Sequence, residues 1–300
     1  MLKKLFRGQD LVEKLGYERW VLRESVLAVE KGYGITSDST VTFQLDGLKT
    51  HKLEMYAEFG SSKRIEVLEN LSPLLFVTCY KALDMIFEWI LEENESNVPF
   101  QFAKKIKLYE HSNGLSEFKY PTSLINEQPL IQVFFKLYKK LAIYRNKIIH
   151  GNWGTNVCGD LYFSFEDRNK HYELNVSFKD ILYLSEAVSL LTDELIARSV
   201  DSESVYMTIK FLVDKLEHLH GDPLFNISKP KHYKVEYELG DKNFIDIEEI
   251  RNYLIKQSSG MPISFHLLIL SKTNKWMLPW NVIRDLNCID LSDDWTKYKL

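Results

Sequence analysis

Three side chains suited to phosphodiester chemistry, Arg145, Asn146 and His150, lie within residues 144–151 of this 300-residue chain. A histidine can accept or donate a proton near neutral pH. An arginine can stabilise the extra negative charge that a phosphate gains in the transition state. An asparagine can orient the imidazole or a phosphate oxygen. Together they are suited to proton transfer and charge stabilisation at a phosphodiester.

A helix must position these groups. From Leu130 onward, apolar residues recur at the steps of three and four that build one buried helical stripe: Phe134, Leu137, Leu141, Tyr144 and Ile148. Gly151 can then adopt the left-handed conformation that ends a helix, so we expect His150 in the final turn. The structural alternative is that His150 is only a positive charge that complements the helix dipole.

The angular positions of the three side chains favour a dimer. At about 100° per residue, Asn146 and His150 lie on one ridge, whereas Arg145 lies about 140° from His150 around the axis. One helix therefore cannot easily direct both Arg145 and His150 at one atom. Two copies of the helix could each contribute to a shared cleft, so the spacing predicts a homodimer.

The Arg-Asn pair, three further residues, His and a helix-ending Gly resemble the signature of the HEPN superfamily, over roughly residues 65–200. This resemblance implies a helical bundle and catalytic roles for Arg145, Asn146 and His150. Many members are metal-independent RNA endonucleases of toxin–antitoxin, CRISPR and antiphage systems that act as homodimers. The resemblance thus implies a defence or toxin role, with RNA as substrate and an antitoxin or a phage-derived trigger as a partner.

Two further expectations come from the same resemblance. In members paired with nucleotidyltransferase antitoxins, a Tyr follows the His by two positions. Here that position is Asn152, so regulation by modification of that Tyr is not expected. Related domains also keep the bundle without activity, so the alternative is a non-catalytic dimerisation or RNA-binding module.

The segment that carries the motif is basic, although the chain has a formal net charge of −4. Between Gln128 and Gly159 there is no Asp or Glu, and Arg145 is accompanied by four lysines: Lys136, Lys139, Lys140 and Lys147. Such a strip on an otherwise acidic chain is suited to binding RNA phosphates. The alternative is an ordinary solvated helix face.

Composition and motifs favour a cytoplasmic protein without a membrane segment, metal or cofactor. The longest apolar stretch is interrupted by Lys81, Asp84 and Glu88, and no secretory signal precedes it. The three cysteines are far apart and have no Cys-x-x-Cys spacing, so we expect buried thiols in a reducing compartment. His218 and His220 lie on different helix faces without a third ligand nearby, which does not make a metal site.

We predict a mixed α+β fold, mainly α, with a HEPN-like helical bundle, β-hairpin elaborations and a smaller C-terminal α+β module. The predicted domains are an N-terminal extension (1–64), the bundle (65–200) and the C-terminal module (201–300). That module could include the N-terminal hairpin if the two ends of the chain meet in space.

The elements expected in these domains follow from apolar periodicity and turn residues. A short helical start precedes a hairpin over residues 41–56 with a longer loop. Long helices begin near residues 71, 130 and 177, the last with a capping box of Ser177 and Asp180. Shorter elements are a helix over 102–109, a hairpin over 161–176, helices over 205–219 and 247–255, and strands over 233–237 and 263–270.

Overall fold

The computed structural model describes residues 6–30, 39–45, 48–54, 69–94, 97–111, 118–151, 153–198, 202–221, 225–240, 244–292 and 294–300. For residues 26–30, 39–45, 48–54 and 111 it describes the backbone alone. Within these ranges the fold is mixed α+β and mainly α, as predicted. The described residues within 1–34, 58–198 and 209–226 form one compact unit, the helical unit, and those within 35–57, 199–208 and 227–300 form a second, the sheet unit.

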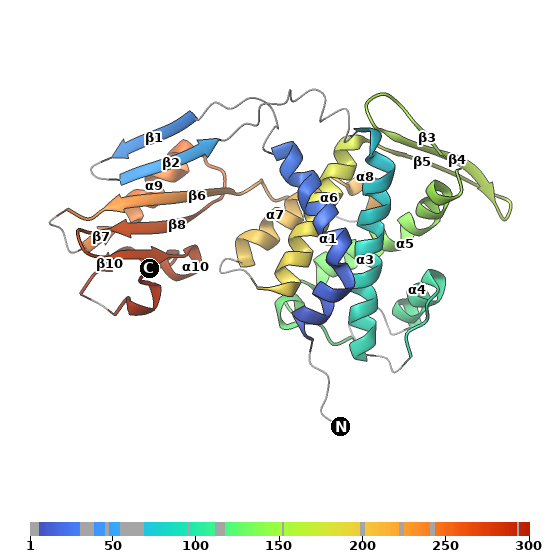
Figure 1. The fold of residues 1–300 in the computed structure, drawn as a ribbon, viewed down its shortest axis with the longest axis horizontal. Helices are drawn as coiled ribbons and strands as arrows, with labels where there is room; N and C mark the ends of the chain where they lie inside the picture. Colours follow the sequence, from blue (N-terminus) through green and yellow to red (C-terminus); the bar gives the residue numbers. More distant parts are fainter. Residues whose placement is uncertain are drawn as a thin grey trace. The chain divides into compact units, whose positions relative to one another are not determined.

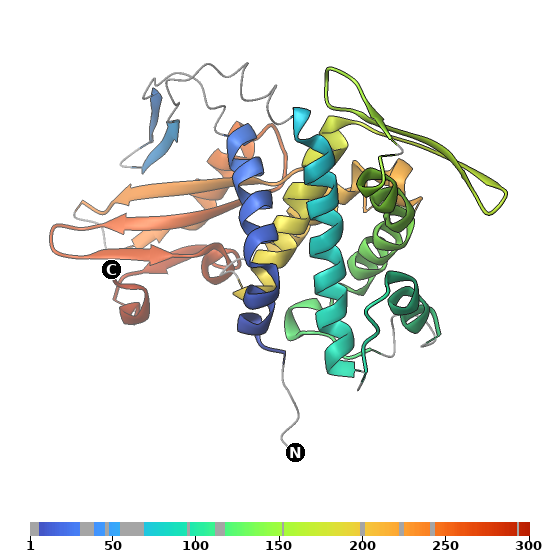
Figure 2. The same ribbon diagram turned by 45° about the vertical axis from the view of Figure 1, so that its right-hand side comes forward.

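The core of the helical unit is built from long helices that lie side by side (Figure 1 and Figure 2). They are α1 (Gly8–Glu30), α3 (Ser72–Asn94), α5 (Gln128–Ile149) and α6 (Phe178–Ile196). α3 packs against the other three, and α1 also packs on α6. The three predicted long helices are thus confirmed. So is the capping box, since Ser177 Oγ accepts from Asp180 N at 3.1 Å and Asp180 Oδ2 accepts from Ser177 N at 2.9 Å.

α1 is longer than the short helical start that the sequence predicted. It buries residues at steps of four and three, at positions 11, 15, 18, 22 and 25. Two of these are polar, Glu18 and Ser25. Apolar periodicity alone therefore does not predict the full buried stripe. Lys81 Nζ pairs with Glu18 at 2.5 Å, and Ser25 Oγ donates to the Leu22 carbonyl at 2.7 Å. Because these partners offset the burial of polar atoms, α1 joins the bundle.

The helical unit also carries an antiparallel sheet in the order β3–β4–β5: β3 (Gly154–Thr155), β4 (Leu161–Asp167) and β5 (Lys170–Val176). β4 and β5 are the predicted second hairpin, whereas the two-residue β3 is too short to leave a periodic signal. Arg168 and Asn169 in the turn have φ of 49° and 61°, which suits a two-residue hairpin connection. One face of the sheet is buried, with Phe163 5.9 Å from Phe76 of α3 and 5.2 Å from Tyr144 of α5 between ring centroids.

Shorter helices complete this part of the chain. Between α3 and α5 lie α4 (Phe102–His111), which is the predicted short helix, and the 3-10 turn η2 (Thr122–Leu124). The predicted helix over 205–219 is divided into α7 (Ser202–Asp214) and α8 (Glu217–His220). The division between the two units runs through α7.

The sheet unit is built around strands in the order β1–β2–β6–β8–β9: β1 (Ser39–Leu45), β2 (Leu48–Glu54), β6 (Lys231–Glu238), β8 (Ile263–Leu270) and β9 (Lys275–Leu278). β6 and β8 are parallel, and α9 (Ile247–Gln257) connects them. Leu254 of α9 shares a buried core with Val235 and Leu267 of these strands. Small elements complete the unit: β7 (Phe244–Asp246), α10 (Trp280–Ile283), β10 (Cys288–Asp290) and η3 (Thr296–Tyr298). The predicted strands and helix of this region are confirmed.

The N-terminal hairpin belongs to the sheet unit, because β2 pairs with β6 at Leu48↔Tyr237. The longer loop that the sequence predicted is wrong, since the ladder continues to Leu45↔Leu48. Met55 and Tyr56, the last residues of the predicted second strand, lie outside the described residues. The observed units therefore differ from the predicted ranges 1–64, 65–200 and 201–300: α1 packs with the bundle and the hairpin with the C-terminal strands.

Two sequence expectations about compartment can be compared with the described residues. None of their helices combines the length and apolar character needed to cross a bilayer. Cys79 is buried, but Cys158 and Cys288 are exposed, so the prediction of three buried thiols is wrong for two of them.

Candidate functional site

The motif helix α5 ends as the sequence predicted. Pro129 lies in its first turn, where a missing N–H removes no helical hydrogen bond. At the other end, the His150 N–H donates to the Asn146 carbonyl at 3.1 Å, and Gly151, with φ of 77°, donates to the Ile148 carbonyl at 3.3 Å. The left-handed glycine closes the helix and leaves His150 at its exposed end. Asn152 lies outside the described residues.

Arg145 and Asn146 are in direct contact. Arg145 Nη1 donates to Asn146 Oδ1 at 3.1 Å. The guanidinium also lies over the ring of Phe102 in α4, with Cζ 5.1 Å from the ring centroid, a cation–π contact. Arg145 Nε is buried and has no hydrogen-bond partner within the described part of the chain. Arg145 is therefore held between its own helix and α4.

His150 has no recorded hydrogen bond to either residue of this pair in the described part of the chain. Its side chain is exposed, and the described residues record no hydrogen bond or ion pair for the imidazole. The helix places it about 140° around the axis from Arg145, which turns toward α4. Among the described residues, the recorded hydrogen bonds join Arg145 to Asn146 and neither of them to His150. The Asn146 amide oxygen accepts from Arg145 and does not orient the imidazole.

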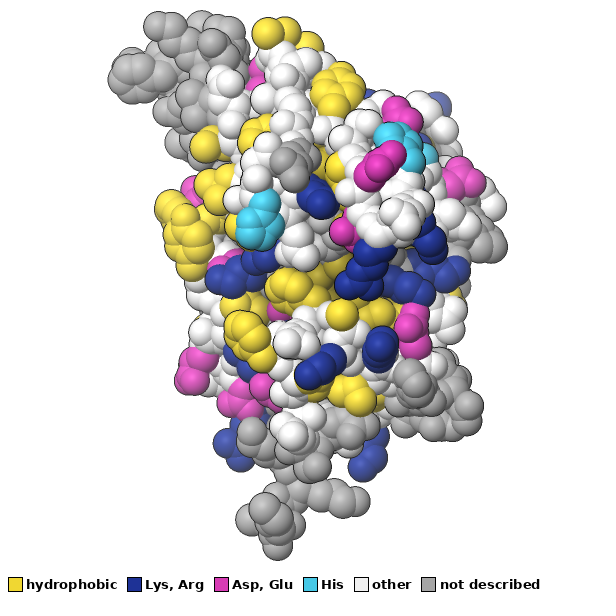
Figure 3. All heavy atoms as spheres, turned by 90° about the vertical axis from the view of Figure 1, so that its right-hand side faces the viewer, with side chains coloured by type: hydrophobic (Ala, Val, Ile, Leu, Met, Phe, Trp, Pro, Cys, Tyr) yellow, Lys and Arg dark blue, Asp and Glu magenta, His cyan; other side chains and the backbone are white. Residues whose placement is uncertain are grey.

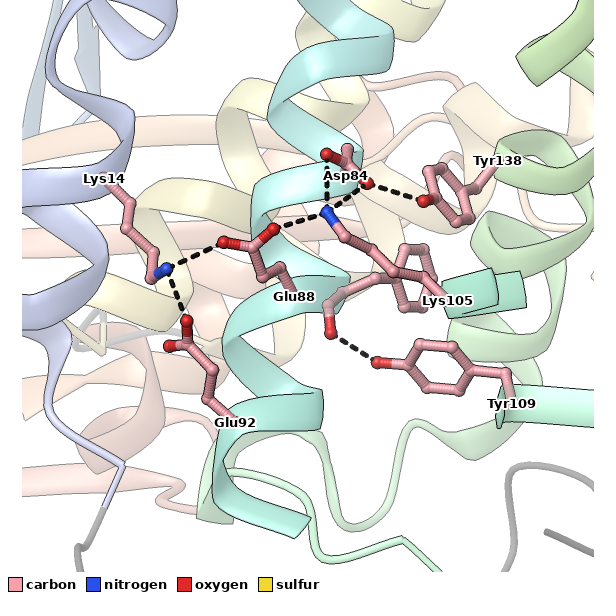
Figure 4. Close-up of polar contacts among 8 residues, drawn as sticks. Lys14, Asp84, Glu88, Glu92, Lys105, Tyr109 and Tyr138 are labelled. Atoms are coloured by element: carbon pink, nitrogen blue, oxygen red, sulfur yellow. Dashed lines mark hydrogen bonds and ion pairs between the residues drawn. The ribbon is translucent and has the colours of Figure 1, made fainter. Parts of the chain in front are cut away.

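A buried polar network fixes α4 against α3 and α5 (Figure 4). Lys105 of α4 is only 1% exposed, and its Nζ donates to both carboxylate oxygens of Asp84 at 3.0 Å and to Glu88. Tyr138 of α5 donates its hydroxyl to Asp84 Oδ1 at 2.5 Å. A lysine this deeply buried is stable only with such compensation. The network therefore joins three helices at one point.

The network has an outer part that reaches α1. Glu88 Oε1 accepts from Lys14 Nζ at 3.0 Å, and the same ammonium donates to Glu92 at 2.8 Å. Burial raises the pKa of Asp84, and this effect exceeds the opposing effects of Tyr138 and Lys105. Burial would also raise the pKa of Glu88, but the hydrogen bonds and charges of Lys105 and Lys14 lower it below its ordinary value of 4.5.

This anchoring of α4 determines where Arg145 lies. Phe102 is one turn before Lys105 on the same face of α4. Its ring meets the ring of Tyr80 edge-on at 5.3 Å, and Arg145 lies on it. Burial raises the pKa of Tyr80, while the nearby charge of Arg145 acts against that rise. The guanidinium is thus close to the bundle core and supported by α3 as well as α4.

The predicted RNA-binding lysines of α5 have different surroundings. Lys139 forms an ion pair with Glu110 of α4, and Lys140 Nζ donates to the carbonyl of His218 at 3.2 Å. Both side chains are exposed on the side of α5 that also carries His150. The ion pair with Glu110 partly neutralises the strip, a feature that the acid-free sequence of α5 did not indicate.

The other two lysines extend the same surface. Lys147 Nζ lies 4.4 Å from the ring centroid of Phe165 in β4, and Lys136 is exposed. Figure 3 shows Lys and Arg side chains gathered around a hydrophobic patch on the side of the molecule that carries α4 and α5, with acidic side chains between them. The surface is thus mixed and locally basic, which does not by itself separate RNA binding from a solvated helix face.

The remaining histidine motif has ordinary partners. His218 Nε2 lies 3.2 Å from Asp180 Oδ2, and His220 Nε2 lies 2.9 Å from the Val213 carbonyl. No group of three or more His, Cys, Asp or Glu side chains suited to a metal ion occurs within the described ranges.

Sequence reasoning missed the supporting residues of the site. Phe102, Lys105 and Tyr109 recur at steps of three and four on α4, so a lysine occupies a buried position in an apolar stripe. That pattern could have indicated a buried ion pair. Its partner Asp84 interrupts an apolar segment of the sequence, and an interruption alone does not indicate a partner.

Comparison with protein-family models, curated proteins and solved structures finds no match to this chain. The interpretation of the site therefore depends on its own residues and geometry.

Proposed function

We propose that the chain is a metal-independent RNA endonuclease whose active site combines Arg145, Asn146 and His150 from two copies of helix α5. The main supporting observation is the exposed end of α5. There Gly151 closes the helix, and the His150 imidazole has no hydrogen-bond partner in the described part of the chain. The resemblance of this motif to that of HEPN domains supports the same assignment.

The proposed reaction needs two proton transfers. The His150 imidazole of one copy takes the proton of the RNA 2′-hydroxyl, and O2′ attacks the adjacent phosphorus. The P–O5′ bond then breaks, and the leaving O5′ receives a proton from the imidazolium of the second copy. The products are a 2′,3′-cyclic phosphate and a 5′-hydroxyl end.

Arg145 would stabilise the negative charge that builds on the phosphate oxygens during this step. Its contacts with Asn146 and Phe102 fix the plane of the guanidinium, which reduces the entropy lost when it binds a phosphate. Asn146 is then a positioning residue for Arg145. Because Arg145 and His150 of one helix diverge, the proposal pairs each Arg145 with the His150 of the partner helix in a homodimer.

The biological role that fits this activity is that of a cytoplasmic toxin or antiviral RNase. The sheet unit would hold the nuclease inactive until an antitoxin is lost or a phage-derived trigger binds. Induced expression of the active chain should then arrest growth, and His150→Ala should relieve the arrest.

The second candidate is a non-catalytic HEPN-like module that dimerises or binds RNA without cutting it. The observation that favours it is the packing of Arg145 on Phe102, together with the lack of an orienting partner for His150 in the described residues. Catalytic histidines are commonly oriented by a hydrogen bond to the second ring nitrogen.

RNA cleavage by the full chain in excess EDTA separates the two candidates. His150→Ala should lower the rate by about 10²- to 10⁴-fold, while His171→Ala, which removes an exposed histidine of β5, should not change it. Melting temperature and sedimentation should be unchanged in both variants, and mass spectrometry should find cyclic phosphate ends. Equal cleavage by a well-folded His150→Ala protein would favour the non-catalytic module.

A further inference from the structure

A hollow of about 440 Å³ lies on the outer face of the β3–β5 sheet. Its lining includes Trp153, Gly154, Tyr162, Ser164, Glu173 and Asn175. The strand register brings the last four together, since Tyr162 pairs with Asn175 and Ser164 with Glu173. These side chains point away from the buried face that carries Phe163. The hollow is thus a separate feature of the surface, formed by aromatic rings and polar groups.

The hollow is connected to the end of the motif helix. Trp153 is three residues beyond His150, and its Nε1–H donates to the Ile148 carbonyl at 3.1 Å. The indole is therefore fixed to the last turn of α5. A molecule that enters the hollow lies next to the helix end at which the proposed reaction takes place.

The aromatic side of the hollow is held in place before any ligand binds. Tyr162 is 41% exposed, and its hydroxyl accepts from Asn156 Nδ2 at 2.9 Å. Asn156 is fixed in turn, because its Oδ1 accepts from the backbone N–H groups of Cys158 and Asp160 at 3.0 Å. The strand position opposite Tyr162 is Gly154, where an added Cβ would meet nothing within 4 Å. Space is therefore open beside a fixed ring.

The polar side of the hollow has unused hydrogen-bonding groups. The described residues record no hydrogen bond or ion pair for the side chains of Ser164, Glu173 and Asn175. A carboxylate accepts hydrogen bonds and repels phosphate, so Glu173 is suited to the edge of a nucleobase and not to the RNA backbone. Two adjacent N–H donors would match its two oxygens. Guanine has such a pair on its Watson–Crick edge, N1–H and the 2-amino group.

We propose that this hollow binds a guanine base of single-stranded RNA beside the scissile phosphate and sets the base preference of cleavage. The base stacks on Tyr162 and Trp153, and Glu173 accepts from its N1–H and 2-amino group. Single-stranded RNA is required, because in a duplex this edge is already paired. The inference rests on the proposed nuclease function for its reaction, but binding tests it independently.

Fluorescein-labelled RNA hexamers that differ at one base test the proposal by anisotropy, with His150→Ala as the background so that RNA stays intact. A hexamer with one guanine in a uridine sequence should bind roughly 5- to 150-fold more tightly than the adenine hexamer. Inosine, which lacks the 2-amino group, should give an intermediate affinity. Glu173→Gln should remove the preference, and Tyr162→Ala should weaken guanine binding by roughly 5- to 150-fold.

The matched control is Glu166→Gln, which neutralises an exposed carboxylate on β4 outside the hollow and should leave the preference intact. Equal binding of all hexamers, or a preference that survives Glu173→Gln, would overturn the proposal even if the wild type cleaves RNA. A guanine preference without any cleavage by the wild type would instead refute the nuclease function and still support guanine binding in the hollow. Binding of an arginine-rich peptide in place of RNA would also overturn the guanine proposal, since a guanidinium offers the same paired N–H donors.

Discussion

Replacing Lys105 by Met should destabilise the helical unit strongly. The change removes a positive charge whose side chain is 2% exposed and leaves Asp84, with an 11% exposed side chain, without its ammonium partner. Removal of one partner from a buried ion pair costs about 3–5 kcal/mol. For a unit of about 150–250 residues, in which about 1 kcal/mol shifts the melting temperature by 2–4 °C, the expected decrease is roughly 6–20 °C.

Lys14→Met is the matched control, because Lys14 and Lys105 share the carboxylate of Glu88. The Lys14 pairs are more exposed, at 26% for Lys14 and 28% and 35% for Glu88 and Glu92. Exposed pairs contribute about 0–1 kcal/mol, so this variant should lose at most about 4 °C. The two variants remove the same charge from the same cluster and differ mainly in burial.

Thermal and urea unfolding followed by helical circular dichroism measure the effect. Adding Asp84→Asn to Lys105→Met should recover part of the loss, because the unpaired buried charge is removed. Without Lys105 the folded-state pKa of Asp84 should rise further, so the deficit should be smaller in acid, where Asp84 is protonated, than at neutral pH. Equal losses in the Lys105 and Lys14 variants would refute the assignment of a buried, mutually dependent network.

The remaining predictions concern separate features of the protein. Burial raises the pKa of the Cys79 thiol to about 12, so a thiol reagent should label Cys158 and Cys288 in the folded protein and Cys79 only in denaturant. Rapid labelling of Cys79 under native conditions would contradict its burial. The pKa of Glu88 is lower in the folded protein than its ordinary value of 4.5. The ionised Glu88 therefore stabilises the fold above pH 4.5, and this stabilisation is lost as the pH falls through the folded-state pKa. The stability difference between wild type and Glu88→Gln, from urea titrations, should therefore shrink in acid. Gly151→Ala should lower the free energy of unfolding by about 1–2 kcal/mol, because φ at this position is 77°. The added Cβ meets no atom within 4 Å, so the loss comes from the backbone conformation alone. An unchanged urea midpoint would show that α5 can end without a left-handed residue.

The elements that sequence periodicity predicted best are those whose buried stripe is purely apolar. β8 was predicted with its observed bounds because it is a continuous apolar run between polar turns. α1 was underestimated because Glu18 and Ser25 are buried in its stripe, and only tertiary partners make that possible. β3 is too short for any periodic pattern.

The candidate site was predictable in composition but not in contacts. Residue types and spacing located the end of α5 and the glycine that closes it. The sequence could not indicate that Phe102 supports Arg145, since that contact depends on how α4 packs after an irregular connection. Nor could it assign Asn146 to Arg145, because adjacent residues on a helix are not expected to face each other.

The pairing of β2 with β6 affects how this chain can be synthesised and divided. The hairpin leaves the ribosome early, yet its neighbour Tyr237 is made only after the whole bundle sequence. Until then the free edge of β2 is open to strands of other molecules, which is an aggregation hazard. A fragment cut after residue 200 would keep that edge permanently unpaired. A recombinant bundle should therefore omit the hairpin. Its helix α1 can be joined directly to the segment that follows the hairpin through a short flexible linker.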